Sequence, residues 1–264
     1  MTARVPVALT IAGSDSSGGA GIQADLKTFH ALGVYGMSAV TALTAQSTQG
    51  VSGVVAIDAA FVAEQIDTTV RDIPPDAVKT GMLANGAIVE AVAEAVDRHR
   101  FPALVVDPVI VATTGALLLD PAGIEAVRAL LLPRATIVTP NAPEAAELLG
   151  MVVRSAEDQE AAARALVVDL GAPAALVKGG DLEGDEVVDV FFDGDRIEIF
   201  RDPRIRTTST HGSGCALASA IAAHLARGAS LLDAVREARA WVRRGIENAP
   251  ALGHGRGPLD LFGS

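Results

Sequence analysis

Cysteine is nearly absent from this sequence: Cys215 is the only one among 264 residues. A lone cysteine excludes an intramolecular disulfide, which is typical of a reducing cytoplasm, and no cluster of Cys and His offers a zinc site. Aromatic residues are also scarce, at 3 %. The core must therefore rest on Ala, Val, Leu and Ile, as in tightly packed layers of helices on a sheet.

Basic residues are in the minority, and the formal net charge is −11. Such an acidic chain argues against nucleic acid or an anionic membrane as the main partner, while it leaves room for a local basic site that binds a phosphorylated ligand. The first residues lead into a strand-like stretch without the features of a signal peptide, and no apolar run approaches the length of a membrane-spanning helix. We therefore expect a cytoplasmic location.

What the chain does have is a regular alternation of apolar, strand-like runs and helical segments. Hydrophobic residues make up 50 % and charged residues 20 %, so a sizeable core can be buried. The alternation predicts an α/β fold with a mostly parallel central sheet flanked by helices, and no linker divides the chain, so we expect one domain over residues 1–264. The strands of this sheet are expected at residues 5–12, 36–45, 77–80, 104–106, 135–138 and 174–177.

Local signals predict where several elements begin and end. Gly13 is expected to stop the first strand, and Pro121 to open a helix that runs to about residue 132. Segments 186–192 and 196–200 read as a β-hairpin. Other helix starts are marked by Asp58, Asn85, the Ser155-x-x-Asp158 capping box and Ser230.

Polar and glycine residues gather at the carboxyl ends of the expected strands, where open parallel sheets bind their ligands. These ends are Gly13, Gln46, Thr80-Gly81-Met82, Asp107, Thr139 to Asn141, and Lys178-Gly179-Gly180. The Gln46 amide can pair with the edge of an aminopyrimidine or pyridine ring, and the Met82 sulfur can cover its face. A strand-end contact and a core filler are the simpler interpretations of these two residues.

The segment Gly212-Ser213-Gly214-Cys215 is the strongest functional signal, because two glycines precede an Ala-rich helix expected from about Cys215. The amides at such a helix start face an anion and can stabilise charge on a transferring phosphoryl group. A helix N-terminus can also lower the pKa of a thiol, so that Cys215 could accept a proton from a substrate hydroxyl. The alternatives are an ordinary Gly-rich loop and a small buried apolar residue.

Lys178 at a strand end can neutralise nucleotide phosphates, and the amide and carboxylate of Asn141-x-x-Glu144 suit hydrated Mg²⁺. Asp107 can support the metal or a polar network. The alternatives are a turn with a solvated lysine, a helix cap with an acidic first turn, and a turn cap.

An NAD-dependent enzyme is a competing interpretation, because Gly19-Ala20-Gly21-Ile22-Gln23-Ala24 fits G-x-G-x-x-A after a strand. However, the next strand ends at Gln46 without the Asp or Glu that would bind a ribose, and the glycines come several residues after the first strand. The sequence also contains no G-x-x-x-x-G-K-[ST] phosphate loop.

Taken in order, these segments resemble the hydroxymethylpyrimidine/phosphomethylpyrimidine kinases of thiamine biosynthesis, nearly from end to end. The resemblance is carried by ALTIAGSDSSGGAGIQAD (8–25), TALTAQ (41–46), KTGML (79–83), VDP (106–108), TPNAPE (139–144), KGG (178–180) and THGSGC (210–215). It implies a ribokinase-like fold and the phosphorylation of 4-amino-5-hydroxymethyl-2-methylpyrimidine, and then of its monophosphate, with ATP and Mg²⁺. A pyridoxal/pyridoxine kinase of the same fold is the alternative, and a non-catalytic pyrimidine sensor is the alternative from another class. The family and the exposed hairpin suggest a homodimer.

The resemblance also assigns roles to matching positions. It places the pyrimidine at Gly13, Asp25, Gln46, Met82 and Val109. It places ATP at Lys178, Asn141, Thr208, Gly212 and Gly214, and the metal at Asp107, Asn141 and Glu144. Catalysis would fall to Lys178, to an anion hole of Gly212, Ser213 and Gly214, and to Cys215 as the base. The chain departs from the family at Thr113-Thr114-Gly115, where many members carry a lysine that bears on the second phosphorylation, and at Asp181, where some relatives have His.

Overall fold

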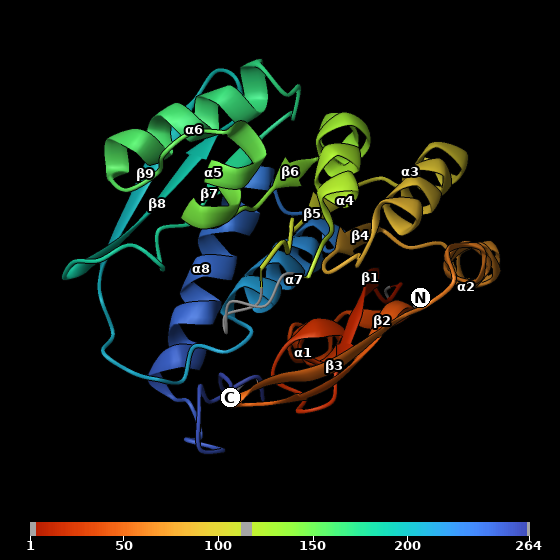
Figure 1. Ribbon diagram of the computed structural model, residues 1–264, viewed down its shortest axis with the longest axis horizontal. Helices are drawn as coiled ribbons and strands as arrows, with labels where there is room; N and C mark the ends of the chain where they lie inside the picture. The colour runs from red at the N-terminus through yellow and green to blue at the C-terminus, as the bar shows by residue number, and fades with distance from the viewer. Residues whose placement is uncertain (1–3, 112–117, 263–264) are drawn as a thin grey trace.

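One nine-stranded sheet forms the centre of the computed structural model, which describes residues 4–111 and 118–262 (Figure 1). Its order is β3-β2-β1-β4-β5-β6-β7-β8-β9. The strands are β1 (Val7–Asp15), β2 (Tyr35–Ser47), β3 (Gly50–Ala56), β4 (Ala77–Thr80), β5 (Leu104–Val106), β6 (Ile137–Val138), β7 (Ala175–Val177), β8 (Glu186–Phe192) and β9 (Ile197–Pro203). The six from β2 to β7 in this order are parallel, while β3, β8 and β9 pair antiparallel. The predicted mostly parallel sheet with an added hairpin is confirmed.

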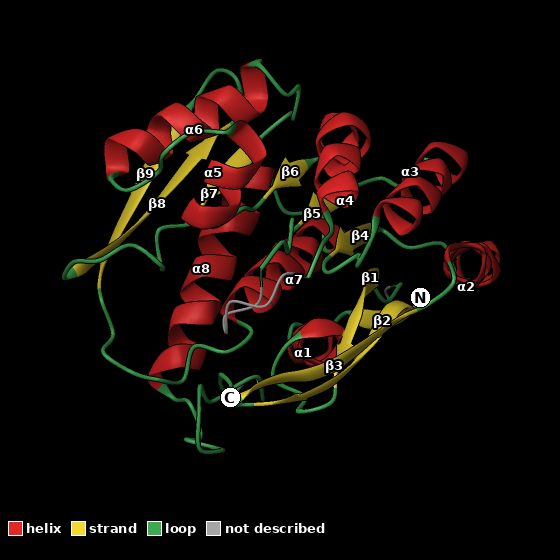
Figure 2. Ribbon diagram, in the orientation of Figure 1, coloured by secondary structure: helices red, strands yellow, loops and turns green. Residues whose placement is uncertain are grey.

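Helices cover both faces of the sheet (Figure 2). They are α1 (Gly21–Ala31), α2 (Ala59–Asp72), α3 (Gly86–His99), α4 (Pro121–Ala126), α5 (Ala142–Leu149), α6 (Ala156–Val168), α7 (Ser213–Ala226) and α8 (Leu231–Glu247). Side chains of α2 to α6 join one core cluster, and those of α1, α7 and α8 join the other. Alternate residues of β1 divide between the two clusters, with Leu9 in the first and Ala8 in the second. The expected helix-on-sheet layers are therefore present.

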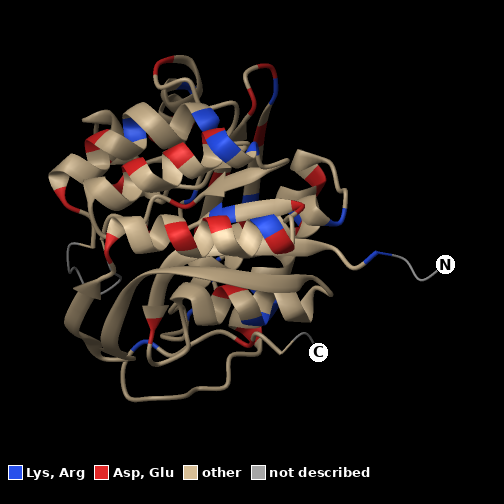
Figure 3. Ribbon diagram, turned by 90° about the vertical axis from the view of Figure 1, so that its right-hand side faces the viewer, with Lys and Arg blue, Asp and Glu red and all other residues tan. Residues whose placement is uncertain are grey.

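The core is aliphatic, as the composition requires. Among the described residues, the largest fully buried side chains include only two aromatic ones, Phe29 and Phe191, and one lysine, Lys79. Figure 3 shows the charged residues mainly on helices and loops. No helix among residues 4–111 and 118–262 is both long and apolar enough to cross a membrane.

Most predicted helix starts are confirmed. Asp58, Asn85 and Ser230 each accept a backbone hydrogen bond as N-cap residues, and Pro121 is the first residue of α4 after the N-cap Asp120. The capping box of Ser155 with Asp158 is also formed. These signals are local, because a side chain two or three positions away satisfies each helix start.

Two predicted boundaries are wrong, and one strand was not predicted. β1 does not stop at Gly13 but continues to Asp15, because a register shift in its pairing with β2 absorbs the irregularity. The helix from Pro121 ends at Ala126 and continues as a π-helical turn (Val127–Leu131) and a 3₁₀ turn (Leu132–Arg134), where Pro133 cannot continue a regular helix. β3 was not predicted because its residues are largely exposed and follow no apolar alternation.

Residues 253–258 cross the turn between β2 and β3. The backbone of Arg256 donates to the Thr48 carbonyl oxygen over 2.8 Å, and Gly255 N donates to Thr48 Oγ1 over 3.2 Å. The Gly257 carbonyl oxygen then accepts from His211 N over 3.0 Å. This crossing segment joins the turn after β2 to the residues that precede α7.

Candidate active site

The carboxyl ends of the parallel strands and the start of α7 meet at one edge of the sheet. Lys178 Nζ lies 2.9 Å from Asp107 Oδ1, and the backbone of Lys178 forms a parallel bridge with Asn141. A Cβ atom added to Gly214 would lie 3.1 Å from Lys178 Nζ. The structure therefore brings together a lysine, a carboxylate and a glycine of the segment over residues 212–215, as the strand ends predict.

Lys178 and Asp107 form a largely buried ion pair, with side chains 12 % and 3 % exposed. Burial alone would lower the pKa of Lys178, but Asp107 and Glu144 reverse this effect and raise it. Thr139 Oγ1 donates to Asp107 Oδ1 over 3.1 Å and holds the carboxylate in place. A cation is thus fixed beside the glycine segment at neutral pH.

Asn141 and Glu144 form a reciprocal cap at the start of α5. Asn141 Oδ1 accepts from Glu144 N, and Glu144 Oε2 accepts from Asn141 N, each over 2.8 Å. Burial raises the pKa of Glu144 to about 7, although Lys178 acts against it. Asn141 and Glu144 therefore form the helix cap that the alternative interpretation of these residues predicts.

The donor set also fits a magnesium ion that is bound partly by substrate phosphates. Mg²⁺ in phosphoryl-transfer sites needs only one or two protein carboxylates and keeps several waters. Asp107 and Glu144 supply two buried carboxylates with one neighbouring lysine. No group of three His, Cys, Asp or Glu that could hold a metal occurs in the described residues, so these carboxylates do not form an all-protein cage.

The start of α7 has a glycine N-cap and no capping side chain. Gly212 is this N-cap, with a φ of 79°. A Cβ at Gly212 would lie 1.9 Å from the Gly19 carbonyl oxygen, so the loop closes against residues 19–20 only with glycine. Ser213 and Gly214 are the first two helical residues, and residues 212–215 are half-buried. The Ser213 amide donates to the Thr210 carbonyl oxygen over 3.2 Å, and the amides that follow it have the placement that an anion-binding helix start requires.

Cys215 is half-buried in the first turn of α7. Burial raises the pKa of its thiol to about 11, although the charge of Lys79 acts in the opposite direction. This shift is opposite to the lowering expected from a helix N-terminus. A base role for Cys215 therefore requires that the thiol lose its proton before it can accept one from the substrate hydroxyl.

Gly13 and Met82 lie against one another at the ends of β1 and β4. Gly13 N donates to the Met82 carbonyl oxygen over 3.1 Å, and a Cβ at Gly13 would lie 3.0 Å from Met82 Sδ. Gln46 lies at the end of β2, and its Nε2 is 3.4 Å from His211 Nε2. Gln46 also lines an open depression of about 540 Å³ together with Ser16 and residues 45, 47 and 49–52. Gly13 and Met82 do not line this depression.

The sequence did not reveal the pair of His211 and Asp15. His211 Nε2 lies 2.8 Å from Asp15 Oδ2, and both side chains are buried. Ser17 and Ala20 also donate to the Asp15 carboxylate, so that it organises the loop between β1 and α1. Both residues lie inside the motifs that carry the resemblance, but they are 196 positions apart and no spacing rule connects them.

We expect the fold to become less stable in acid, because the Asp15 carboxylate loses its interactions with His211 and Ser17 when it is protonated. Burial alone would raise the pKa of Asp15, but hydrogen bonds from His211 and Ser17 outweigh it and lower the pKa to about 2, from 3.8. A carboxyl group with a lowered pKa in the folded state stabilises the fold above pH 4. Here this stabilisation is about 2 kcal/mol, and it is lost as the pH falls to 2. Urea unfolding at pH 5, 4, 3 and 2 would measure this loss against an Asp15→Asn variant. An identical pH slope in the variant would contradict the expectation.

Asp25, which the resemblance places near the pyrimidine, is surrounded by buried polar partners. It is fully buried, and its carboxylate accepts from Lys79 Nζ over 3.0 and 2.9 Å, from Thr10 Oγ1 over 2.6 Å and from Ser219 Oγ over 2.6 Å. With both oxygens engaged in this way, Asp25 lies beneath the site. We therefore propose that it supports the site rather than contacting the pyrimidine.

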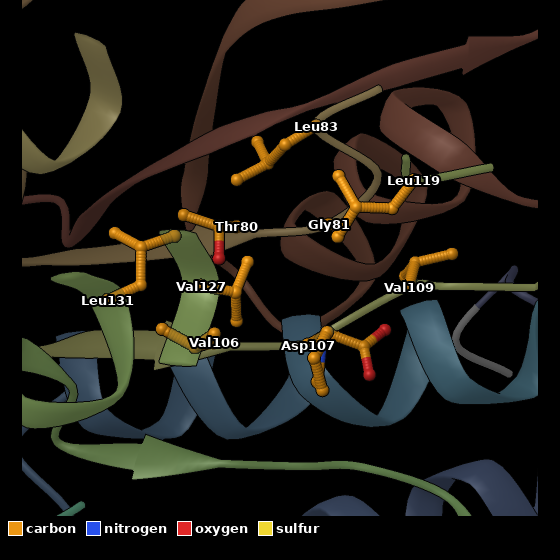
Figure 4. Close-up of a pocket in the computed structure, with 10 residues that line it drawn as sticks. Thr80, Gly81, Leu83, Val106, Asp107, Val109, Leu119, Val127 and Leu131 are labelled. Carbon is orange, nitrogen blue, oxygen red and sulfur yellow. The ribbon is translucent and has the colours of Figure 1, made fainter. Parts of the chain in front are cut away.

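The other positions named in the sequence analysis have different surroundings. Val109 is half-buried and lines a cavity of about 10 Å³ beside Asp107 and the unpaired hydroxyl of Thr80 (Figure 4). Thr208 is exposed on the segment that leads from β9 to α7, and Asp181 is exposed after Gly180. The departure at Thr113-Thr114-Gly115 lies outside the described residues.

Comparison with known proteins decides the family. A family model described as phosphomethylpyrimidine kinase matches residues 15–260. The chain belongs to this family. It is 49 % identical to a hydroxymethylpyrimidine/phosphomethylpyrimidine kinase of Synechococcus elongatus over 98 % of both chains. It is 46 % identical to the kinase of that name from Bacillus subtilis, over 97 % of this chain and 94 % of the relative.

Solved structures of similar proteins share the fold. The pyridoxal kinase of Staphylococcus aureus, in complex with AMP-PCP and pyridoxal, superposes with a TM-score of 0.90 at 37 % identity. The match covers 98 % of this chain and 94 % of that chain. The predicted ribokinase-like fold and the predicted kinase family are therefore confirmed, and an NAD-dependent enzyme is not.

Proposed function

We propose that this protein phosphorylates 4-amino-5-hydroxymethyl-2-methylpyrimidine, and then its monophosphate, at the expense of ATP in thiamine biosynthesis. The observation that carries the proposal is the family match over residues 15–260, joined to the meeting of Lys178, Asp107 and the uncapped start of α7 at one sheet edge. We treat residues 1–264 as one kinase domain, because one sheet connects β1 to β9.

The chain's own residues divide the work along this edge. The amides at residues 212–215 and the Lys178 ammonium stabilise the negative charge of the phosphoryl group in transfer. Gln46, Gly13 and Met82 hold the ring so that its hydroxymethyl oxygen faces this group. Asp107, Asn141 and Glu144 would hold Mg²⁺, which neutralises phosphate charge when bound.

Each transfer forms one bond and breaks another. The hydroxymethyl oxygen forms a bond to the γ-phosphorus, the bond from that phosphorus to the β,γ-bridging oxygen breaks, and the hydroxyl proton must leave. We propose that Cys215 takes this proton. The products of the first step are ADP and the pyrimidine monophosphate, and the phosphate of that product is the acceptor in the second step.

We expect Cys215→Ala to lower kcat about 100-fold, because a general base contributes at least this factor. The Kd of the pyrimidine should stay within about threefold, since the ring-binding residues are unchanged. Single-turnover kinetics and calorimetric titration would separate the two effects. Near-normal turnover would remove Cys215 as the base and leave the anion-binding segment as the main catalytic element. Cys215→Ser is a less clean test, because its hydroxyl can position a water.

A pyridoxal kinase is the second candidate, because solved structures of pyridoxal kinases match this chain at TM-scores of 0.89 and 0.90. A substrate panel decides between them: ADP release is measured with the pyrimidine alcohol, its monophosphate, pyridoxal and pyridoxine. Much more efficient turnover of pyridoxal would overturn the pyrimidine proposal. Turnover of any of these substrates would eliminate a non-catalytic sensor.

We also propose a cytoplasmic homodimer. Residues 35–57, which include β2 and β3, contain no charged side chain, and they expose Leu43, Val54 and Val55. β3 is an edge strand, and an uncharged exposed edge favours pairing with another chain. The mass in solution, measured by sedimentation, tests this assembly.

A further inference from the structure

Arg204 stands at the end of β9, where the chain begins its path toward α7. Its side chain donates to four backbone carbonyl oxygens of the loop over residues 180–186, which follows the Lys178-Gly179-Gly180 turn. Nε donates to Gly184 over 2.8 Å and Nη1 to Gly180 over 2.8 Å. Nη2 donates to the carbonyl oxygens of Leu182 and Glu186. One guanidinium therefore closes the whole loop.

These hydrogen bonds use most of the N–H donors of the Arg204 guanidinium. A guanidinium has five N–H donors, and four of them go to these carbonyl oxygens. Arg204 is thus not arranged as a free anion ligand. Its rigid planar fork fits this set of acceptors, whereas the single ammonium of a lysine cannot reach four oxygens spread over seven residues.

The loop that Arg204 closes continues from the phosphate end of the site. Lys178 Nζ lies beside Asp107 and Gly214, and the chain leaves the site through Gly179 and Gly180. Gly179 is fixed from the other side, since its N donates to Asp189 Oδ1 over 3.0 Å and Arg239 Nε holds Asp189 Oδ2 at 2.7 Å. The position of the turn thus depends on Asp189 on one side and on the loop on the other.

The geometry of transfer places the nucleoside near this loop. The attacking and leaving oxygens lie on opposite sides of the transferred phosphoryl group. The proposed acceptor residues Gly13 and Gln46 are on β1 and β2, so the rest of ATP extends toward β7 and β8. There the loop over residues 180–186 and the segment from Arg204 to α7 run side by side, and Arg204 joins them; Figure 1 shows β8 beginning and β9 ending at this side.

We propose that Arg204 is a positioning residue for the nucleotide: it holds the loop after Lys178-Gly179-Gly180 in the shape that binds ATP and ADP. This inference rests on the proposed ATP-dependent function. It predicts that nucleotide binding depends on the planar guanidinium of Arg204 and its several donors, and that a positive charge alone is not enough. Arg204→Lys should therefore behave like Arg204→Gln.

Arg206 provides the matched control. It lies two residues further along the same segment and pairs with Asp185 of the same loop, at 2.7 Å between Nη2 and Oδ1. Both side chains of that pair are more than four-fifths exposed, at 85 % and 89 %. Arg206→Gln therefore removes a positive charge from the same surface without releasing the loop carbonyl oxygens.

The test compares wild type, Arg204→Lys, Arg204→Gln and Arg206→Gln. Calorimetric titration with Mg·ADP should give a Kd about tenfold higher in both Arg204 variants and unchanged in Arg206→Gln. The KM for ATP should rise by a similar factor, while kcat at saturation and the KM for the pyrimidine stay within about twofold. Amide exchange should quicken at Leu182, whose N donates to the Gly179 carbonyl oxygen over 3.1 Å.

Three outcomes would overturn the proposal. An Arg204→Lys variant that binds Mg·ADP like wild type would show that the charge suffices. An equal loss in Arg206→Gln would show that the surface potential is responsible. A fall in kcat with an unchanged Kd for ADP would place Arg204 in another role.

The ADP titration also separates this proposal from the proposed function. Wild type that binds ADP but transfers no phosphate to the pyrimidine would overturn the function, while the variants still decide the role of Arg204. Wild type that binds no ADP would overturn both.

Discussion

Replacing Gly212 with alanine is expected to lower kcat/KM about 100-fold. The new Cβ would lie 1.9 Å from the Gly19 carbonyl oxygen, and the residue would have to keep a φ of 79°. The loop must therefore move away from residues 19–20, and the amides at the start of α7 move with it. Displacing a charge-stabilising group by about 1 Å, or removing one donor, costs about 100-fold or more in rate. Steady-state kinetics with the preferred alcohol would measure the loss.

Gly228→Ala is the matched control for this variant. Gly228 follows the other end of α7 with a similar φ of 86°, but an added Cβ would have no heavy atom within 4 Å. It introduces the same backbone strain, of about 1 kcal/mol, without the collision. We expect its kcat/KM to stay within about twofold of wild type. A comparable loss of activity in both variants would show that strain in α7, and not the collision at Gly19, is responsible.

Lys79→Met is expected to lower the free energy of unfolding by about 3–5 kcal/mol, which is the typical cost of removing one partner from a buried ion pair. Lys79 and Asp25 have no exposed side-chain surface, and the Asp25 carboxylate joins β1, β4, α1 and α7 through Thr10, Lys79 and Ser219. Without Lys79 the carboxylate is left charged in the core. Urea unfolding at pH 7 would measure the change.

Two further variants identify the cause of that loss. Asp25→Asn in the Lys79→Met background removes the buried charge. Its amide oxygen still accepts from one of the Thr10 and Ser219 hydroxyls and its NH2 group can donate to the other, so the variant should recover part of the stability. Lys27→Met on the exposed side of α1 should change stability by no more than about 1 kcal/mol, since Lys27 donates only to the Gly18 carbonyl oxygen. A double variant less stable than Lys79→Met would contradict the charge explanation.

The strand ends and helix caps were predictable because their causes are local. A capping side chain acts within three positions, as at Asn85 and Ser155, and a parallel sheet places its strand ends at one edge whatever the loops do. This is why the sequence brought Lys178 and Asp107 to one site. The position of Asp25 was not predictable in this way, since its burial depends on Lys79 and Ser219, which are 54 and 194 positions away.

The surroundings of a side chain were harder to predict from the sequence than the place of its residue along a helix or strand. The helix start at Cys215 is visible in the sequence. The direction of the pKa shift of its thiol is not, because burial there outweighs the charge of Lys79. The role of Arg204 was equally hidden, since its partners are backbone carbonyl oxygens, which every residue has. The Asp15–His211 pair required the fold to join two loops from opposite ends of the chain.

The contacts of residues 253–258 with the turn after β2 can form only late in the synthesis of residues 1–258. Gly255 and Thr48 are 207 positions apart, so a ribosome that adds 5–20 residues per second makes them about 10 to 40 s apart. During that interval β2 and β3 leave the ribosome with Leu43 and Val55 exposed and without the segment that later covers their turn. For that interval the nascent chain therefore carries an uncharged, exposed ribbon, and His211 receives its backbone contact with Gly257 only after residue 257 has been made.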